Sequence, residues 1–395
     1  MAEKSGFKTV DSNLEEIDAK IREHRFGIYR RMAIIGITVI ALCVGTQLWM
    51  EMRSYSSYSV LSSVDRNGSS AARYETFLGN IIEYSNDGIN YVDGQNEQIW
   101  NQSFEMTSPV IEMCEDYLTV YDQSGTEIYI MTEAGLQEKI ETSKPIQKVC
   151  IAEQGTIAVL MKENDVSYVK LYDKKGKELA NGEFYGSKGG CPIDIALSHD
   201  AKKMAVDIID VNGGSVKSTI TFYNFGSVGQ NEIDNNVGSF SFDNVFIPDI
   251  AYMADNRMVA MGDEKFIIFG GKEKPKVIKE IPIEQELKSV FYNENYIGVT
   301  YESEKEGSTY HIKVYDIKGK IVMENDTELF YDTIRFLSNN EICVRNEEQC
   351  ELFTKHSVKK FSYTFDNRFL YAESLDRYQN YILIFQGTTE EVRLK

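Results

Sequence analysis

The sequence predicts an all-β protein, a β-propeller preceded by a single N-terminal transmembrane helix. Three observations predict this fold. An uncharged apolar segment lies at residues 32–50. Beyond Gly79, apolar residues recur as in short strands rather than as in helices. A unit of strand, polar turn and strand then recurs up to the C-terminus, and repetition about every 40–45 residues is typical of propellers.

The composition excludes several classes of protein. The chain has 395 residues, with 42 Lys and Arg against 61 Asp and Glu, a formal net charge of −19. This acidic balance excludes a nucleic-acid partner, because binding to phosphates requires clustered Lys and Arg. A hydrophobic share of 42% is sufficient for a buried core, so wholesale disorder is excluded. Six cysteines in so long a chain exclude a small disulfide scaffold.

Residues 32–50 (MAIIGITVIALCVGTQLWM) are predicted to form the transmembrane helix. The segment is about 28 Å long as a helix, close to the hydrocarbon thickness of a bilayer. The lipid bilayer is therefore the first predicted partner. Arg30 and Arg31 precede the span and Trp49 ends it, so these side chains are expected at the membrane interfaces. A buried core helix is the alternative, but core helices this uniformly apolar are rare.

Basic residues around the span predict its orientation. Five lie shortly before it and three follow it up to residue 73: Lys20, Arg22, Arg25, Arg30 and Arg31, then Arg53, Arg66 and Arg73. The positive-inside rule places the N-terminus in the cytoplasm and the C-terminal domain outside a cell membrane that the chain crosses once. No A-x-A-like site follows the apolar run, so we expect an uncleaved signal-anchor rather than a signal peptide.

Two short segments flank the span. Residues 1–31 are predicted to be a cytoplasmic leader, partly helical, because Ser12 and Glu15 have the spacing of a capping box. This helix is either a docking helix or, as we favour, an extension of the spanning helix. Residues 51–70 are rich in serine and are predicted to be a linker.

The repeat comprises eight copies of two apolar strands joined by a polar turn. The copies begin at Ile81, Val110, Lys148, Ile193, Asp249, Ser289, Thr333 and Phe369. Sheets arranged radially cover one another's faces, which a single sheet cannot do. Residues 71–395 are therefore predicted to form one extracytoplasmic propeller, with eight blades favoured. Seven blades are an alternative, because the short first interval leaves room for only a thin blade, and β-sandwiches are another.

Turns of the pattern Tyr-Asp-x-x-Gly follow some copies. They begin at Tyr121, Tyr172 and Tyr315. The Asp side chain can bond to the turn backbone and Gly can adopt a positive φ, so we expect hairpin turns. The last copy is short of an outer strand. We therefore expect residues 71–77, before the first copy, to pair with the C-terminal strand and close the ring.

The Tyr-Asp-x-x-Gly-Lys turns, together with GQNEQIW around Trp100, resemble the repeats of pyrroloquinoline-quinone-like and WD40-like propellers. The whole layout is similar to an uncharacterised family of single-pass, membrane-anchored propellers from clostridial-type Gram-positive bacteria. In that layout a short leader, one span and a Ser-rich linker precede a degenerate propeller. The resemblance implies a surface-facing membrane protein of unknown function, since the fold alone assigns no activity.

No catalytic, cofactor or metal site is predicted. No H-E-x-x-H, G-x-S-x-G, G-x-G-x-x-G or Walker-type loop is present. The adjacent cysteines typical of quinone-dependent dehydrogenases are missing as well, so no cofactor is expected. His199, His311 and His356 are far apart in sequence and are expected to be surface residues. The acidic stretch from Asp207 to Gly214 lacks the spacing of a calcium loop and is expected to be a solvated hairpin.

Cysteine spacing predicts one candidate disulfide. No C-x-x-C is present, which excludes zinc ribbons and thioredoxin-like chemistry. A turn centred between Asn346 and Glu347 would place Cys343 opposite Cys350. Residues opposite each other on antiparallel strands lie near disulfide reach. The alternative is two free thiols packed between blades.

Three functions remain open on the sequence alone. The favoured one is a binding or scaffold module without catalysis, whose loops contact an unknown protein or cell-envelope partner outside the membrane. The second is an enzyme that acts on a carbohydrate or small metabolite, which requires acidic or histidine side chains to converge at the channel mouth. The third is a transmembrane sensor that relays a signal to the cytoplasmic leader.

Overall fold

The computed structural model describes residues 14–66, 72–211, 214–376 and 378–395. The chain divides into two compact units, Met1–Arg53 and Ser54–Lys395. The described part of the first unit is mainly one long helix, α1 (Leu14–Glu51). The second unit is built almost entirely of β-strands. It also contains one helical turn, α2 (Gly186–Gly189), and two 3₁₀ turns, η1 (Gly229–Asn231) and η2 (Ile233–Asn235).

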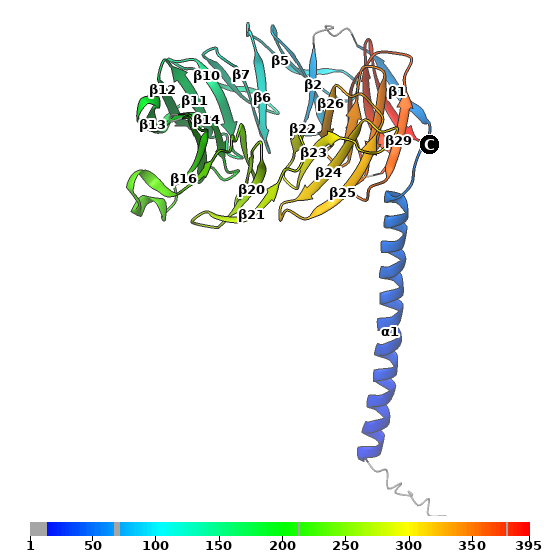
Figure 1. Cartoon of the computed structure of the whole chain (residues 1–395). Helices are drawn as coiled ribbons and strands as arrows, with labels where there is room; N and C mark the ends of the chain where they lie inside the picture. Colours follow the sequence, from blue (N-terminus) through cyan, green and yellow to red (C-terminus); the bar gives the residue numbers. More distant parts are fainter. Residues whose placement is uncertain (1–13, 67–71, 212–213, 377) are drawn as a thin grey trace, which may run out of the picture. The chain divides into compact units, whose positions relative to one another are not determined.

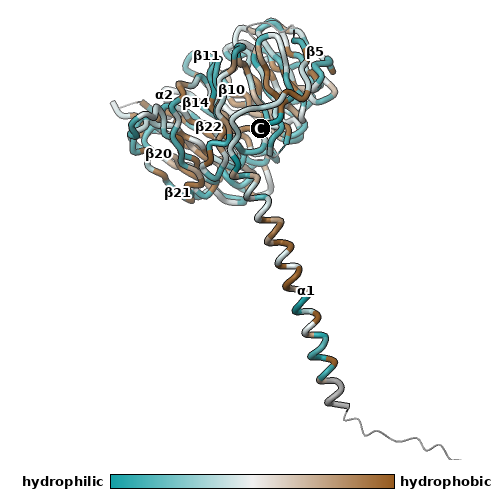
Figure 2. The backbone as a smooth tube through the Cα atoms, turned by 90° about the vertical axis from the view of Figure 1, so that its right-hand side faces the viewer, coloured by the Kyte–Doolittle hydropathy of each residue, from teal (hydrophilic) through white to brown (hydrophobic). Residues whose placement is uncertain are grey.

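Helix α1 is continuous, and within it Ala19–Glu51 is long and apolar enough to cross a membrane. Figure 2 shows hydrophobic residues concentrated in the C-terminal half of α1 and hydrophilic residues toward its N-terminal end. Two of its threonine hydroxyls are hydrogen-bonded within the helix, because Thr38 and Thr46 donate to backbone carbonyls at 2.9 Å. The continuity from Leu14 agrees with an extension of the spanning helix, whereas Ser12 of the expected capping box lies outside the described residues.

The strands of the second unit form eight four-stranded antiparallel sheets. Blade 1 consists of β2 (Arg73–Phe77), β3 (Asn80–Ser85), β4 (Gly88–Val92) and β5 (Gln98–Ser103), and blade 2 of β6 (Pro109–Cys114), β7 (Tyr117–Asp122), β8 (Glu127–Thr132) and β9 (Gly135–Glu141). Blade 3 consists of β10 (Ile146–Ile151), β11 (Ile157–Glu163), β12 (Val166–Tyr172) and β13 (Glu178–Tyr185), and blade 4 of β14 (Cys191–Leu197), β15 (Lys203–Asp210), β16 (Lys217–Asn224) and β17 (Asn236–Asp243).

The second half of the ring follows the same plan. Blade 5 consists of β18 (Asp249–Ala254), β19 (Arg257–Met261), β20 (Lys265–Gly270) and β21 (Lys276–Pro282), and blade 6 of β22 (Leu287–Tyr292), β23 (Tyr296–Glu302), β24 (Tyr310–Asp316) and β25 (Ile321–Thr327). Blade 7 consists of β26 (Thr333–Phe336), β27 (Ile342–Arg345), β28 (Gln349–Phe353) and β29 (Lys359–Thr364). Blade 8 combines β30 (Phe369–Ser374), β31 (Asn380–Phe385) and β32 (Thr388–Leu394) with β1 (Tyr58–Asp65).

The blades follow one another around a ring, so the predicted eight-bladed propeller is confirmed (Figure 1). Seven of the eight sequence copies are the first two strands of a blade. The copy beginning at Ile81 is instead β3 and β4, the second and third strands of blade 1. The inner strand of that blade is β2, which begins at Arg73. The interval between the copies beginning at Ile81 and Val110 was therefore short because the first copy begins one strand late in its blade. The blade itself is not thin.

Strand β1 closes the ring and corrects two expectations. It pairs antiparallel with β32, from Tyr58 opposite Leu394 to Asp65 opposite Thr388. The expected linker over residues 51–70 is therefore partly an outer strand, whose half-exposed position tolerates the serines that suggested a linker. Residues 71–77 were expected to close the ring, but β2 belongs to blade 1.

Hydrophobic residues pack between each pair of neighbouring blades. Tyr91 of blade 1 and Leu118 of blade 2 share one such cluster. Phe222 and Phe269 meet between blades 4 and 5, with ring centroids 5.1 Å apart. The clusters continue across the closure, where Tyr74 of blade 1 lies with Ile384 of blade 8. The core is thus a ring of inter-blade layers, as the radial arrangement requires.

The predicted hairpin turns form at all three places, and two of them use the Asp side chain and the Gly backbone as expected. Asp173 Oδ1 accepts hydrogen bonds from two backbone N–H groups of its own turn, and Asp316 does the same. Gly176 and Gly319 have φ values of +73° and +72°. Asp122 differs, because its carboxylate accepts from the backbone N–H groups of residues 107 and 108 in the preceding inter-blade segment.

Candidate functional site

Each blade begins with its innermost strand, so successive hairpin turns alternate between the two faces of the ring. We call the turn between the first and second strands of each blade its mouth turn; these turns join β2 to β3, β6 to β7, β10 to β11, β14 to β15, β18 to β19, β22 to β23, β26 to β27 and β30 to β31. All mouth turns therefore lie on one face. The turns between second and third strands lie on the opposite face.

The mouth turns of blades 3, 4 and 5 are joined by hydrogen bonds. Glu153 N donates to His199 O at 2.9 Å, which joins blade 3 to blade 4. Asp200 N donates to Asp255 Oδ1 at 3.1 Å, which joins blade 4 to blade 5. Lys203 Nζ adds a bond to Asn256 Oδ1 at 2.7 Å. These turns form one continuous arc.

A second arc joins blades 6, 7 and 8. Asn293 Nδ2 donates to Asn340 Oδ1 at 2.8 Å, and the hydroxyls of Ser338 and Ser374 lie 2.9 Å apart. Polar side chains that a tight turn needs for its own backbone thus also bond across blades. The two arcs hold mouth turns from six blades in fixed positions.

Carboxylates gather around the channel at this face. Burial and four nearby carboxylates together raise the pKa of the Cys114 thiol to about 12. They belong to Glu115, Glu294, Glu153 and Asp255, which come from four different blades. The first three of these side chains are exposed. The mouth face therefore has a negative potential that extends over several blades.

Deeper in the ring, a charged cluster joins three inner strands. Lys148 Nζ of β10 lies 2.6 Å from Asp194 Oδ1 of β14 and 3.2 Å from Asp249 Oδ1 of β18. Asp194 is buried, and its other oxygen accepts a hydrogen bond from Ile250 N at 2.7 Å. Burial alone would lower the pKa of Lys148, but Asp194 and its neighbours raise it well above the ordinary value. Lys148 is therefore a permanent cation that links blades 3, 4 and 5.

Glu112 of β6 is the fourth member of this channel cluster. Burial raises the pKa of Glu112 to about 7, although Lys148 opposes the shift. Glu112 lines a cavity of about 220 Å³ together with Lys148, Cys150, His199, Tyr292 and Glu294. A carboxyl that titrates near neutral pH beside a cavity can bind or release a proton there.

The acidic stretch 207–214 was expected to be a solvated hairpin. Strands β15 and β16 do pair as a hairpin, and residues 212 and 213 lie outside the described residues, but Asp207 is not solvated. It lies in β15, directly opposite Asp194 of β14, and is fully buried. Neither carboxylate oxygen has a hydrogen-bond partner among the described residues. Burial raises the pKa of Asp207 to about 8, with a further contribution from Asp194.

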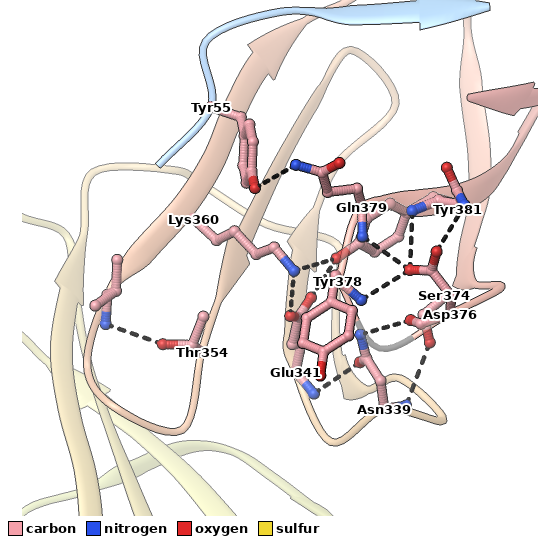
Figure 3. Close-up of polar contacts among 12 residues, drawn as sticks. Tyr55, Asn339, Glu341, Thr354, Lys360, Ser374, Asp376, Tyr378, Gln379 and Tyr381 are labelled. Carbon is pink, nitrogen blue, oxygen red and sulfur yellow. Dashed lines mark hydrogen bonds and ion pairs between the residues drawn. The ribbon is translucent and has the colours of Figure 1, made fainter. Parts of the chain in front are cut away.

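A buried polar cluster joins blades 7 and 8 below their mouth turns (Figure 3). Lys360 is 1% exposed, and its Nζ lies 2.5 Å from Glu341 Oε1 and 2.9 Å from Tyr381 Oη. Tyr381 also donates to Glu341. Burial and the Glu341 carboxylate both raise the pKa of Tyr381. The charge on Lys360 is thus compensated, and the cluster is structural.

The chain segment before β1 packs on the same two blades. Tyr55 N donates to Lys360 O at 2.7 Å, and Gln379 Nε2 donates to Tyr55 Oη at 2.7 Å (Figure 3). Ser54 Oγ donates to Lys359 O at 3.1 Å. The propeller unit is therefore ordered from its first residue.

The structure brings the two candidate disulfide cysteines together in a different register. Cys343 lies opposite Leu352 and Cys350 opposite Arg345, so the expected direct pairing of the cysteines was wrong. The turn is centred one residue later than expected, between Glu347 and Glu348, because Asn346 N donates to Gln349 O at 3.1 Å. Both thiols are free and buried, with their Sγ atoms 3.7 Å apart on diagonal positions.

The remaining expected site residues are separate. At the C-terminal end of α1, the Arg53 guanidinium lies 4.6 Å from the Trp49 ring centroid, a contact suited to an interface. Arg30 and Arg31 are exposed on the same helix. His199 lines the channel cavity, whereas His311 lies between blades 5 and 6. No group of three metal-ligating side chains occurs in the described part of the chain.

The channel cluster was missed by sequence analysis, although a signal was present. Glu112, Lys148 and Asp194 are single charges within apolar inner strands (VIEMC, QKVCI and IDIAL). Such a charge on a strand that is otherwise buried requires a partner. The sequence does not show which strand supplies it, because the partners are on other blades.

The fold and these sites define an eight-bladed β-propeller. Its mouth face is polar, with turns joined by hydrogen bonds between blades, and its channel is charged. The chain belongs to the family described as "Family of unknown function (DUF5711)", which matches residues 51–394. No curated protein matches the chain.

Two solved structures illustrate its similarity to other propellers. BamB from Moraxella catarrhalis is 11% identical with a TM-score of 0.48, and the match covers 86% of this chain and 100% of BamB. The WD40 domain of Pan2 from Neurospora crassa is 8% identical with a TM-score of 0.43, and the match covers 73% of this chain and 88% of that domain. At these values the similarity carries no functional assignment.

Proposed function

We propose that this chain is a single-pass membrane protein whose propeller lies outside the cytoplasmic membrane and binds a protein or cell-envelope partner through its mouth turns. The proposal gives the propeller no catalytic role. It rests on the two arcs of hydrogen-bonded mouth turns, which fix side chains of six blades in one surface. A surface ordered before binding loses little conformational entropy when a partner docks.

The charge of this surface indicates the kind of partner. Exposed carboxylates on Glu115, Glu153 and Glu294 favour a partner with basic groups. Membrane placement is supported by the apolar helix and by the excess of Lys and Arg before it. The N-terminus is then cytoplasmic and the propeller extracytoplasmic.

Crosslinking and affinity capture from intact membranes test this function. The mouth variant replaces three exposed carboxylates without changing their size: Glu115→Gln, Glu153→Gln and Glu294→Gln. The matched control replaces three exposed carboxylates on the opposite face: Glu105→Gln, Glu264→Gln and Glu348→Gln. We expect the mouth variant to lose a captured partner that the wild type and the control retain. Equal capture by both variants would exclude the mouth turns as the docking face.

The channel cluster favours an enzyme as the second candidate function. Acidic side chains do converge on the channel, and the Glu112 pKa of about 7 suits a general acid or base. An enzyme would turn over a carbohydrate or small metabolite, and Glu112→Gln would abolish turnover without loss of folding. A double variant, Glu115→Gln with Glu153→Gln, changes no residue that lines the cavity and would then remain active, which separates the two functions.

A further inference from the structure

A cavity of about 810 Å³ lies between blades 5 and 6, and no residue of their innermost strands, β18 and β22, lines it. Its walls come from β21 of blade 5 and from β23, β24 and β25 of blade 6. Cavities of roughly 300–1,000 Å³ are typical of sites for small ligands. We call this cavity the lateral groove.

Hydrogen bonds between the two blades frame the lateral groove. At one end Gln285 Nε2 donates to Glu304 Oε1 at 2.7 Å. At the other end Lys279 Nζ donates to Gly319 O at 2.6 Å. The two blades are therefore held at a fixed separation around the cavity.

One wall is a polar row that crosses blade 6. Tyr301, His311 and Asp326 are opposite one another on β23, β24 and β25. His311 Nδ1 lies 3.0 Å from Asp326 Oδ1, which also accepts from Ser303 Oγ at 3.1 Å. Burial would raise the pKa of Asp326, but the hydrogen bonds from His311 and Ser303 lower it. Ser303 bonds to Asp326 and not to His311, so the row is no catalytic triad.

The charges of the lateral groove are divided between its ends. At the end where β23 finishes, three exposed carboxylates outnumber one cation, Lys305; they belong to Glu284, Glu302 and Glu304. At the end where β24 turns into β25, Lys279 and Lys320 line the groove, and the neighbouring carboxylate of Glu280 is neutralised by Lys265 at 2.7 Å. A ligand with one charge would be attracted at one end only. A linear ligand with a cation at one end and an anion at the other would satisfy both.

We propose that the lateral groove binds a short peptide with a free ammonium group at the acidic end and a free carboxylate at the lysine end. The stretch of β24 from His311 to Tyr315 sets the length, because four strand steps span about 13 Å. An extended peptide of about four residues has that length. This site is independent of the partner proposed for the mouth turns.

Isothermal titration calorimetry on the full-length protein in detergent tests the proposal. The probe is tetra-alanine with free termini, and the comparison peptides are its N-acetylated and C-amidated forms. We expect the free peptide to bind and each blocked form to bind at least about fivefold more weakly, because a charge-assisted contact is lost. Absence of binding by tetra-alanine, or equal binding of free and blocked forms, would overturn the proposal.

Matched variants locate the site on the protein. Lys320→Gln and Glu302→Gln change groove-lining residues, whereas Lys318→Gln and Glu306→Gln change exposed neighbours in the same turn or loop that do not line it. We expect the first two substitutions to weaken tetra-alanine binding at least about fivefold. The other two should leave it unchanged. Unchanged binding in all four variants would place the peptide elsewhere and refute the groove.

Discussion

Arg66 and Glu83 form an ion pair, with 2.7 Å between Nη1 and Oε2, that joins the strand closing the ring to the first blade. Arg66 follows β1 of blade 8, and Glu83 lies in β3 of blade 1. Arg66 is buried, and its Nε also donates to Thr389 Oγ1 at 2.9 Å. The Arg66 side chain thus connects blade 1 with β1 and β32, the two strands of blade 8 that come from opposite ends of the propeller unit.

Replacing Arg66 is expected to destabilise the closure. Arg66→Ala leaves Glu83 without its partner in a poorly solvated position, and breaking such a pair costs about 3–5 kcal/mol. Urea unfolding of the full chain in detergent, followed by near-ultraviolet circular dichroism, measures this loss. The control is Lys139→Ala, which removes an exposed pair with Glu127 and should cost under about 1 kcal/mol. Equal losses in the two variants would contradict a role in closure.

Lys148→Met is expected to destabilise the propeller from its channel. The substitution keeps the length of the side chain but leaves buried Asp194 without its cation, which costs about 3–5 kcal/mol. The control is Lys170→Met, whose pair with Glu178 is partly exposed and is worth under about 1 kcal/mol. The same unfolding measurement applies. A loss for Lys148→Met no larger than for the control would show that the channel cluster is not stabilising.

Asp207 is expected to make stability fall as pH rises. The pKa of Asp207 is about 8 in the folded state and about 3.9 in the unfolded state. Its contribution to the free energy of unfolding is therefore fully present below about pH 4 and is lost as pH rises through 8. The slope is at most about 1.4 kcal/mol per pH unit. Asp207→Asn should flatten this dependence and be more stable than wild type above pH 8. Asp243→Asn, at an exposed site on β17, should leave the profile unchanged.

Cys343 and Cys350 are expected to form a disulfide when a disulfide oxidant is supplied. The hydrogen bond from Cys350 lowers the pKa of Cys343, and Arg335 and Arg345 favour its thiolate, the form that attacks disulfides. Oxidised glutathione accepts the two electrons and leaves as two thiols. Peptide mass mapping after alkylation should show the two cysteines linked in wild type. Complete alkylation of both after oxidation would rule the bridge out.

Membrane orientation is testable by thiol labelling in intact cells. A cysteine at Lys175, exposed in a propeller turn, should react with an impermeant reagent, whereas one at Glu23 should react only after permeabilisation. The wild type gives the background from its own cysteines. The reverse pattern would place the propeller in the cytoplasm.

The fold class could be predicted because a propeller repeats its local pattern. The pattern of apolar strand, polar turn and apolar strand extends over about a dozen residues in each inner hairpin. Eight copies of this pattern predicted a ring of blades. The strand that completes blade 8 could not be found in this way. Residues 58–65 read as a linker because an outer strand with one open edge needs little hydrophobicity, and its partner is more than three hundred residues away.

The candidate sites were less predictable because they depend on contacts between blades. Lys148 meets Asp194 and Asp249 only after three hairpins are placed side by side. The mouth turns were recognised as turns, but their bonds to one another depend on the ring geometry. Cys343 and Cys350 were correctly brought together, yet a turn centred one residue later changed their register.

Blade 8 unites the first strand of the propeller unit with the last strand of the chain. A ribosome makes β1 before the first blade and β32 only after the strands of the other seven blades. Seven blades can form from local hairpins during synthesis, but β1 has no partner until residues 388–394 have been made. Loop closure over such a separation is slow compared with hairpin formation. The nascent propeller is therefore an open arc until β32 has been made, and only then can β1 complete the ring.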